Sequence, residues 1–135
     1  MNFKPWYKVI DPREDLRENK PHDAAEFAVH LEEVRDKRAP DDYAVPQRFF
    51  ERTYLTKNLT QLAAEVLLRL SGEVHGANAV FNLTTQFGGG KTHALTLLYH
   101  LAKHGPEAAT QWFGVDRLLK AAGLKKLLKL STRFY

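Results

Sequence analysis

Apolar residues recur every three or four positions along much of this chain, which is the period of a helix buried on one face. The stretch 58–70 has the broadest apolar face, and Gly72 follows it as a natural helix stop. Weaker patterns of the same kind predict four further helices, at 23–38, from Pro46 through Phe50, at 94–103 and at 115–122. Most of the chain is therefore predicted to be helical.

One short apolar run, Ala79–Leu83, is typical of a buried strand instead. It leads into the glycine triplet Gly88–Gly90, then into Lys91 and Thr92, and then into the helix predicted from Ala94. A strand, a glycine-rich turn, a Lys-Thr pair and a helix follow one another in this order in phosphate-binding loops. We therefore expect an α/β fold: a P-loop NTPase-like fragment, mostly helical, with one strand–P-loop–helix unit preceded by helices.

The chemistry of this loop favours a nucleotide. A glycine-rich backbone can turn its N–H groups toward phosphate oxygens, and the start of the next helix adds unpaired N–H groups and the positive end of its dipole. Lys91 would contact the β- and γ-phosphates, and the Thr92 hydroxyl would hold Mg2+. The expected cofactors are ATP and Mg2+. The expected nucleotide-binding residues are Thr85, Gln86, Phe87, Gly88, Gly89, Gly90, Lys91, Thr92 and His93, with Thr92 as the metal ligand.

The loop departs from the usual G-x-x-x-x-G-K-[ST] pattern at one position, because Thr85 stands where the first glycine belongs. Gly88 and Gly89 lie within the same turn and can relieve it. The alternative interpretation is a glycine-rich turn followed by a lysine that is only solvated. The strand and the helix predicted on either side favour phosphate binding.

The sequence after the loop lacks a part that an ATPase needs. Phosphate-loop folds use a second strand ending in Asp or Glu to help hold Mg2+. After Lys91 the only carboxylates are Glu107 and Asp116, and neither ends an apolar run. We expect no hydrolysis by this chain alone and interpret it as the amino-terminal end of a larger ATPase, apparently truncated. Its predicted regions are a helical N-terminal region (1–72), the first β–P-loop–α unit (73–123) and a basic leucine-rich tail (124–135).

Composition narrows the function classes. The 135 residues suffice for one domain and include no cysteine, which excludes disulfides and thiolate chemistry. No apolar run has the length of a membrane span, and the start lacks a signal peptide's apolar core, so a cytoplasmic location without membrane contact is expected. Residues 1–70 carry 12 Lys/Arg and 13 Asp/Glu, whereas residues 71–135 carry 8 and 3. The basic second half suits a polyanion, either a nucleotide or a nucleic acid.

Two alternatives to nucleotide binding remain open. A non-catalytic helical interaction module would dock a partner on the amphipathic faces of the helices at 23–38 and 58–70. A nucleic-acid-binding fragment would use the basic C-terminal half.

A few other residues also carry expectations. His100 and His104 have the i, i+4 spacing of a shared metal site, but no third ligand lies near them in the sequence. Trp112 and Phe113 are predicted to be core residues. The apolar side chains of the first ten residues are predicted to dock an extended arm onto the core.

Three stretches carry a resemblance to a known family: Arg52–Thr56, Thr84–His93 and Leu97–Leu101. They resemble large prokaryotic predicted ATPases that contain the domain of unknown function 499 and are similar to the AAA+ group. The stretches Pro5–Tyr7 and Asp11–Asp15 also look like that family's start, so the resemblance covers about residues 1–119.

The resemblance implies a nucleotide-binding site and a set of associated proteins. It marks Gly88, Gly89, Gly90, Lys91 and Thr92 as the nucleotide-binding residues, and it implies that threonine at position 85 is usual for the family. It also implies a loose link to DNA-modification and phage-defence proteins. The family's downstream Mg2+ acid and any arginine finger have no counterpart here, so the sequence leaves open whether the chain is an enzyme.

Overall fold

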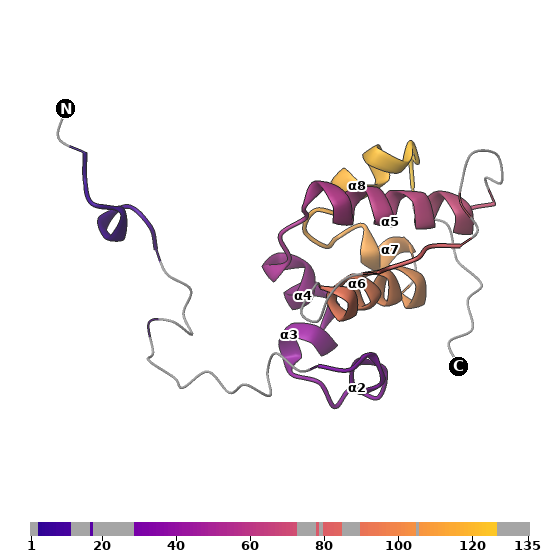
Figure 1. Ribbon diagram of the computed structural model, residues 1–135, viewed down its shortest axis with the longest axis horizontal. Helices are drawn as coiled ribbons and strands as arrows, with labels where there is room; N and C mark the ends of the chain where they lie inside the picture. The colour runs from indigo at the N-terminus through magenta and orange to yellow at the C-terminus, as the bar shows by residue number, and fades with distance from the viewer. Residues whose placement is uncertain are drawn as a thin grey trace.

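The computed structural model describes residues 3–11, 17, 29–72, 78, 80–84, 90–104 and 106–126. Within these residues every regular element is a helix (Figure 1). In chain order the elements are η1 (Trp6–Lys8), α2 (Leu31–Arg35), α3 (Asp41–Ala44), α4 (Pro46–Arg52), α5 (Lys57–Leu70), α6 (Lys91–Lys103), α7 (Pro106–Ala109) and α8 (Val115–Ala122).

The two longest helices, α5 and α6, organise the helical body. Helix α5 contacts α8 on one side and α6 on the other, and α6 also contacts α2 and α4 (Figure 1). Helices α3 and α4 pack on each other and connect α2 to α5. None of the described helices is long and apolar enough to cross a membrane.

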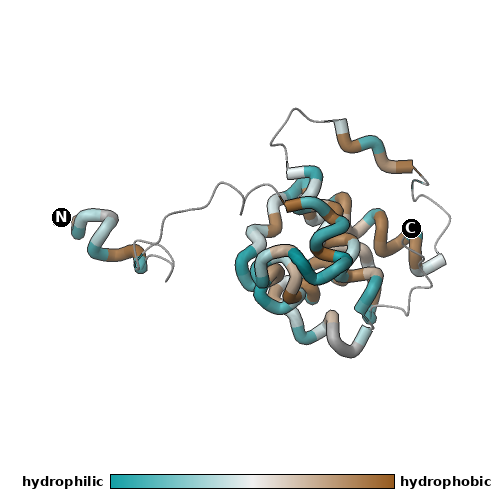
Figure 2. The backbone as a smooth tube through the Cα atoms, turned by 90° about the horizontal axis from the view of Figure 1, so that it is seen from below, coloured by the Kyte–Doolittle hydropathy of each residue, from teal (hydrophilic) through white to brown (hydrophobic). Residues whose placement is uncertain are grey.

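The main hydrophobic core is built from five helices, α4 to α8, together with Leu55 before α5 and Trp112 in the turn before α8. The Phe50 and Trp112 rings stack with their centroids 5.1 Å apart, and Phe49 lies edge-to-face against Phe50. In Figure 2 the hydrophobic stretches of the helical body gather at its centre. The buried members of this cluster are Phe49, Phe50, Leu55, Ala63, Leu67, Leu97, Leu101, Ala109, Trp112, Val115, Leu118 and Leu119. Burial of this apolar surface holds the helices together.

Local sequence explains where the helices begin and end. Pro46 occupies the first turn of α4, where its missing N–H costs nothing. The Thr56 side chain accepts a hydrogen bond from the Leu59 N–H at 3.2 Å and so caps α5. Gly123 ends α8 in the left-handed conformation, with φ 68°. The helices predicted from Pro46, at 58–70 and at 115–122 are confirmed.

The predicted α/β fold is wrong. Residues 80–83 of the predicted strand Ala79–Leu83 are drawn as coil without an arrow (Figure 1), and no strand occurs in the described part of the chain. A strand exists only where its backbone N–H and C=O groups pair with a neighbouring strand, and no such neighbour is found among the described residues. Val80 is 83% exposed, which a buried strand would not allow. The P-loop NTPase-like fragment with a strand is therefore replaced by a helical domain.

Several smaller predictions are also corrected. The helix predicted from Ala94 begins three residues earlier, at Lys91, and the short helices α3 and α7 were not predicted. Trp112 is a core residue as expected, but Phe113 is 68% exposed. The predicted helix at 23–38 is described only from residue 29, where α2 begins at Leu31. The described aromatic and aliphatic side chains of the first ten residues are exposed, so they do not show a docked arm.

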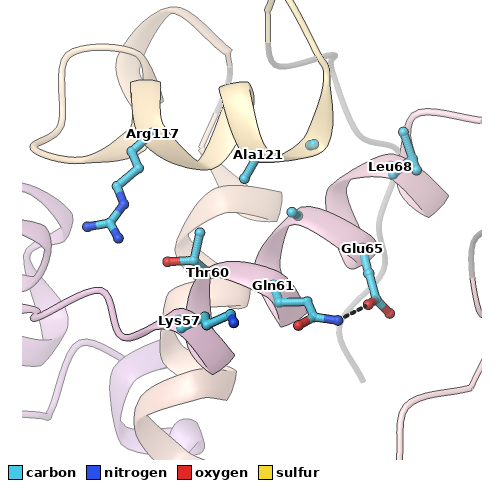
Figure 3. A pocket seen from close by; sticks show the side chains of 9 residues that line it. Lys57, Thr60, Gln61, Glu65, Leu68, Arg117 and Ala121 are labelled. Carbon is cyan, nitrogen blue, oxygen red and sulfur yellow. Dashed lines mark hydrogen bonds between the residues drawn. The ribbon is translucent and has the colours of Figure 1, made fainter.

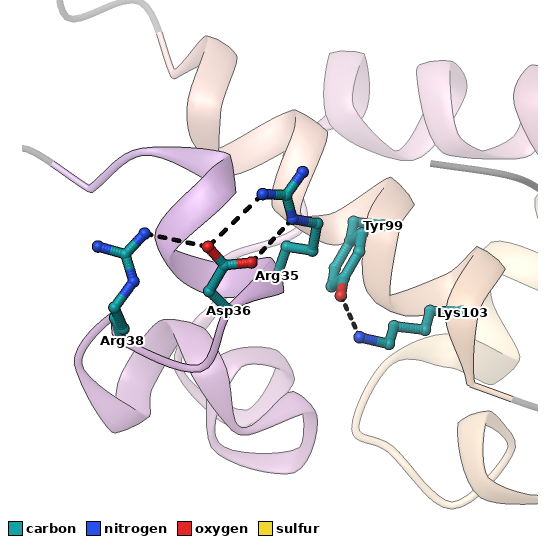
Figure 4. Close-up of polar contacts among 5 residues, drawn as sticks. All are labelled: Arg35, Asp36, Arg38, Tyr99 and Lys103. Atoms are coloured by element: carbon teal, nitrogen blue, oxygen red, sulfur yellow. Dashed lines mark hydrogen bonds and ion pairs between the residues drawn. The ribbon is translucent and has the colours of Figure 1, made fainter. Parts of the chain in front are cut away.

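A second, smaller cluster attaches α2 to α6 through Val34 and Tyr99. Beside it, Asp36 accepts hydrogen bonds from Arg35 and Arg38, as Figure 4 shows. These two guanidinium groups lower the pKa of Asp36 to about 2. Lys103 donates a hydrogen bond to the Tyr99 hydroxyl one turn away (Figure 4). Because the Asp36 ion pairs lie at the surface, they contribute little to stability.

Candidate functional site at the start of α6

The candidate site begins at Gly90, which precedes helix α6 with φ 75° and ψ 16°. This left-handed conformation strains any residue that has a Cβ, so glycine is required here by the backbone. Among the described residues other than its chain neighbours, no heavy atom lies within 4 Å of a Cβ placed on Gly90. The predicted residues Thr85, Gln86, Phe87, Gly88 and Gly89 lie outside the described residues.

Lys91 and Thr92 form the first turn of the 13-residue helix α6. The first helical hydrogen bond runs from the Ala94 N–H to the Gly90 carbonyl at 2.9 Å, so the three preceding N–H groups have no acceptor within the helix. The N-cap residue is a glycine and so has no side chain to cap the helix, and the first turn contains no acidic residue. The arrangement of N–H groups, helix dipole and lysine favours an anion.

His93 anchors this first turn to α4. Its Nε2 lies 3.0 Å from the Thr53 Oγ1, and its ring lies over the Phe49 ring with the centroids 4.6 Å apart. The Thr53 hydroxyl donates its own proton to the Phe49 carbonyl at 2.6 Å, so it must accept from the His93 Nε2–H. Burial lowers the pKa of His93 and so favours the neutral ring. The His93 ring therefore faces the helical body and positions the turn.

A second histidine is buried two turns further along α6. The His100 Nε2 donates to the Tyr43 carbonyl at 2.7 Å, while its Nδ1 is buried without a partner among the described residues. Burial, partly offset by the bond to Tyr43, lowers the pKa of His100 to about 4. His104 lies beside it with a ring-centroid distance of 5.7 Å, but the described residues include no third metal-binding side chain near them. The pair therefore forms part of the packing.

Thr53 is the site residue that sequence reasoning missed. It is 40 positions from His93 and is 5% exposed. The sequence feature that could have pointed to Thr53 is its position within Arg52–Thr56, a stretch that carries the family resemblance. Nothing in a single sequence pairs it with His93. Of the two carboxylates after Lys91, Asp116 lies in the first turn of α8, and the Glu107 side chain is not among the described ones.

Replacing Thr53 with valine should lower the free energy of unfolding by about 1–3 kcal/mol, because the His93 Nε2–H would lose its buried acceptor. Urea denaturation of the 135-residue chain measures this change. Thr53→Ser, which keeps the hydroxyl, is the matched control and should lose less. A valine variant as stable as the parent would show that the Thr53–His93 hydrogen bond does not anchor the turn.

The described part of the chain is thus a small helical domain. Gly90 caps one of its two central helices, α6, and Lys91 and Thr92 form the first turn of that helix. The chain belongs to the DUF499 family, whose N-terminal domain matches residues 1–128. This match confirms the family identity that the sequence motifs indicated. No curated protein and no solved structure matches the chain.

Proposed function

We propose that this chain is the ATP-binding segment of a larger prokaryotic AAA+-like ATPase, and that it binds the nucleotide phosphates at the start of α6. One observation carries the proposal: Gly90 adopts a left-handed conformation directly before Lys91 and Thr92, which open the 13-residue helix α6. Such a start attracts anions through its unpaired N–H groups and its dipole.

Each residue of the turn has a distinct task in this proposal. The N–H groups of the first turn donate to phosphate oxygens, and the Lys91 ammonium group balances their charge. The Thr92 hydroxyl is the ligand offered to Mg2+, and a bound Mg2+ would neutralise charge on the phosphates. Thr53 and His93 hold the turn against α4. Gly88 and Gly89 supply the preceding part of the loop, as their sequence position predicts.

The proposal covers binding and not hydrolysis by this chain alone. Hydrolysis needs an acid that helps to hold Mg2+ and a residue that orients the attacking water. The sequence after Lys91 offers only Glu107 and Asp116, and neither follows an apolar run. Further parts of the larger ATPase would supply the missing acid.

The test is a titration of the 135-residue chain with Mg·ATP, followed by isothermal calorimetry. Lys91→Ala should weaken binding by about tenfold or more, because a charge-assisted contact to phosphate is lost. Lys120→Ala is the control, since Lys120 is exposed on α8, away from the turn. Equal affinity of the parent and Lys91→Ala, or no binding of Mg·ATP to the parent, would refute the proposal.

A second candidate is a non-catalytic helical interaction module. It draws on the exposed apolar residues Phe3, Tyr7, Val9 and Ile10 at the start of the chain, which suit contact with a partner protein. Thermal melting separates the two candidates, because a ligand that binds only the folded chain must raise the melting temperature. An unchanged melting temperature at millimolar Mg·ATP would favour the module.

A further inference from the structure

A pocket lies between α5 and α8, on helices that do not carry the Lys-Thr turn. Its volume is about 340 Å³, within the range of small-molecule sites. Figure 3 shows the two helices side by side with the lining side chains between them. The lining residues are Lys57, Thr60, Gln61, Ala64, Glu65, Leu68, Arg117, Ala121 and Ala122.

The pocket exists because the facing side chains are small. Ala64 of α5 and Ala121 and Ala122 of α8 are too short to fill the space between the helices, and protein interiors otherwise pack closely. Leu68 extends this apolar wall at the far end from Lys57 (Figure 3). The lining therefore offers an apolar wall to a body of modest size, in a surface pocket whose residues Lys57, Gln61 and Ala121 are exposed.

The other end of the pocket is cationic. Lys57 and Arg117 lie in the first turns of α5 and α8, and Figure 3 places them at the same end of the pocket. Neither has an ion-pair partner among the described residues. The positive ends of both helix dipoles add to their charge.

The pocket lining also includes the polar side chains of Thr60 and Glu65. The Thr60 hydroxyl is shielded from water and has no hydrogen-bond partner in the described part of the chain. The Glu65 carboxylate accepts hydrogen bonds from the neutral amides of Gln61 at 3.1 Å and Asn78 at 3.3 Å, and it forms no ion pair with Lys57 or Arg117 among the described residues. Figure 3 shows Glu65 toward the Leu68 end. One end of the pocket thus attracts an anion, while the opposite end combines the apolar Leu68 side chain with the Glu65 carboxylate.

We propose that the pocket between α5 and α8 binds a small amphipathic carboxylic acid, with its carboxylate beside Lys57 and Arg117 and its apolar body along Ala64, Leu68 and Ala121. Two cations with no partner in the described chain are the feature that selects an anion over a neutral or basic ligand. The alanine-lined space selects a compact apolar body. A free small acid is favoured over a bulky chain segment because the space is limited in volume.

The probes are octanoate, octanol and octylammonium, which share one alkyl chain and differ in charge. Each is titrated into the isotopically labelled 135-residue chain, and the backbone amide signals of α5 and α8 are followed by NMR. Octanoate should shift these signals and bind about tenfold or more tightly than octanol, and octylammonium should bind least. No shift of the α5 and α8 signals at millimolar octanoate, or equal affinities for octanoate and octanol, would overturn the proposal.

Three variants locate the binding. Combining Lys57→Gln with Arg117→Gln should reduce octanoate affinity to that of octanol, while Lys120→Gln, on an exposed residue of α8 outside the lining, should leave it unchanged. Ala121→Leu should block the pocket and abolish binding, and its thermal melt shows whether the chain remains folded. Octanoate binding that survives Ala121→Leu in a folded chain would place the acid elsewhere and refute the site.

Discussion

Replacement of Phe50 by alanine should lower the free energy of unfolding by about 3–5 kcal/mol. Phe50 is 1% exposed, stacks on Trp112 and lies edge-to-face against Phe49 at 5.7 Å. Truncation removes apolar contacts from both aromatic neighbours and leaves a cavity where α4 meets the turn before α8. A domain of ordinary stability has only about 5–15 kcal/mol in total, so this variant should be close to unfolding at ambient temperature. Urea denaturation followed by far-ultraviolet circular dichroism measures the loss.

Phe113 provides the matched control for this experiment. It is the same residue type and follows Trp112 directly, but its side chain is exposed. Phe113→Ala should change the free energy of unfolding by about 0.5 kcal/mol or less, as is usual for surface substitutions. Comparable losses in the two variants would show that the Phe50–Trp112 stack is not a centre of the core.

Acidification should destabilise the chain through His100, by about 2 kcal/mol between pH 7 and pH 5. The pKa of His100 falls from 6.5 in the unfolded chain to about 4 in the folded chain, chiefly because burial disfavours the charged ring. The Nε2–H already donates to the Tyr43 carbonyl, so a second proton would have to sit on the buried Nδ1, which has no acceptor in the described structure. His104 and Lys103 add repulsion.

The sign of the effect follows from proton counts. Between pH 6.5 and 4 the unfolded chain binds the extra proton and the folded chain does not, so stability is greatest above pH 6.5 and declines as the pH falls toward 4. The lowered pKa values of His93 and His104 act in the same direction. Asp36 titrates in a lower window, below its ordinary 3.8 and toward about 2, and does not affect this range.

The measurement is the urea midpoint at a series of pH values for the parent and for His100→Gln. Glutamine retains a donor for the Tyr43 carbonyl but does not titrate, so the variant should lose most of the decline between pH 7 and pH 5. His30→Gln is the control on an exposed histidine and should keep the parent slope. A parent whose stability is flat over this range would contradict the buried neutral His100.

Helices with strong local signals were predictable from the sequence. Their signals lie in residues close together in the sequence. These signals are the apolar period of α5, Pro46 at the start of α4 and Gly123 at the end of α8. The predicted strand failed because a strand depends on a pairing partner elsewhere in the chain, and a short apolar run does not reveal one. Trp112 and Phe113 also show that a local pattern cannot replace tertiary structure. The two aromatic residues are adjacent, but the folded turn before α8 buries Trp112 and exposes Phe113.

The candidate site was predictable only in part. The motif located Gly90, Lys91 and Thr92, and the structure places the helix start at these residues. The link between Thr53 and His93 was beyond reach, because hydrogen bonds across 40 positions leave no periodic trace in one sequence. The remaining loop residues, 85–89, lie outside the described part of the chain and stay a prediction.

The attachment of His93 to Thr53 and Phe49 affects how an anion would be captured. The opening turn of α6 is held by α4 before any ligand arrives, so its backbone loses little freedom when an oxyanion docks. Binding of an anion would then cost little free energy for ordering the first turn of α6, and the affinity would be higher without any additional contact. For the proposed nucleotide, such preorganisation would lower the entropic cost of binding.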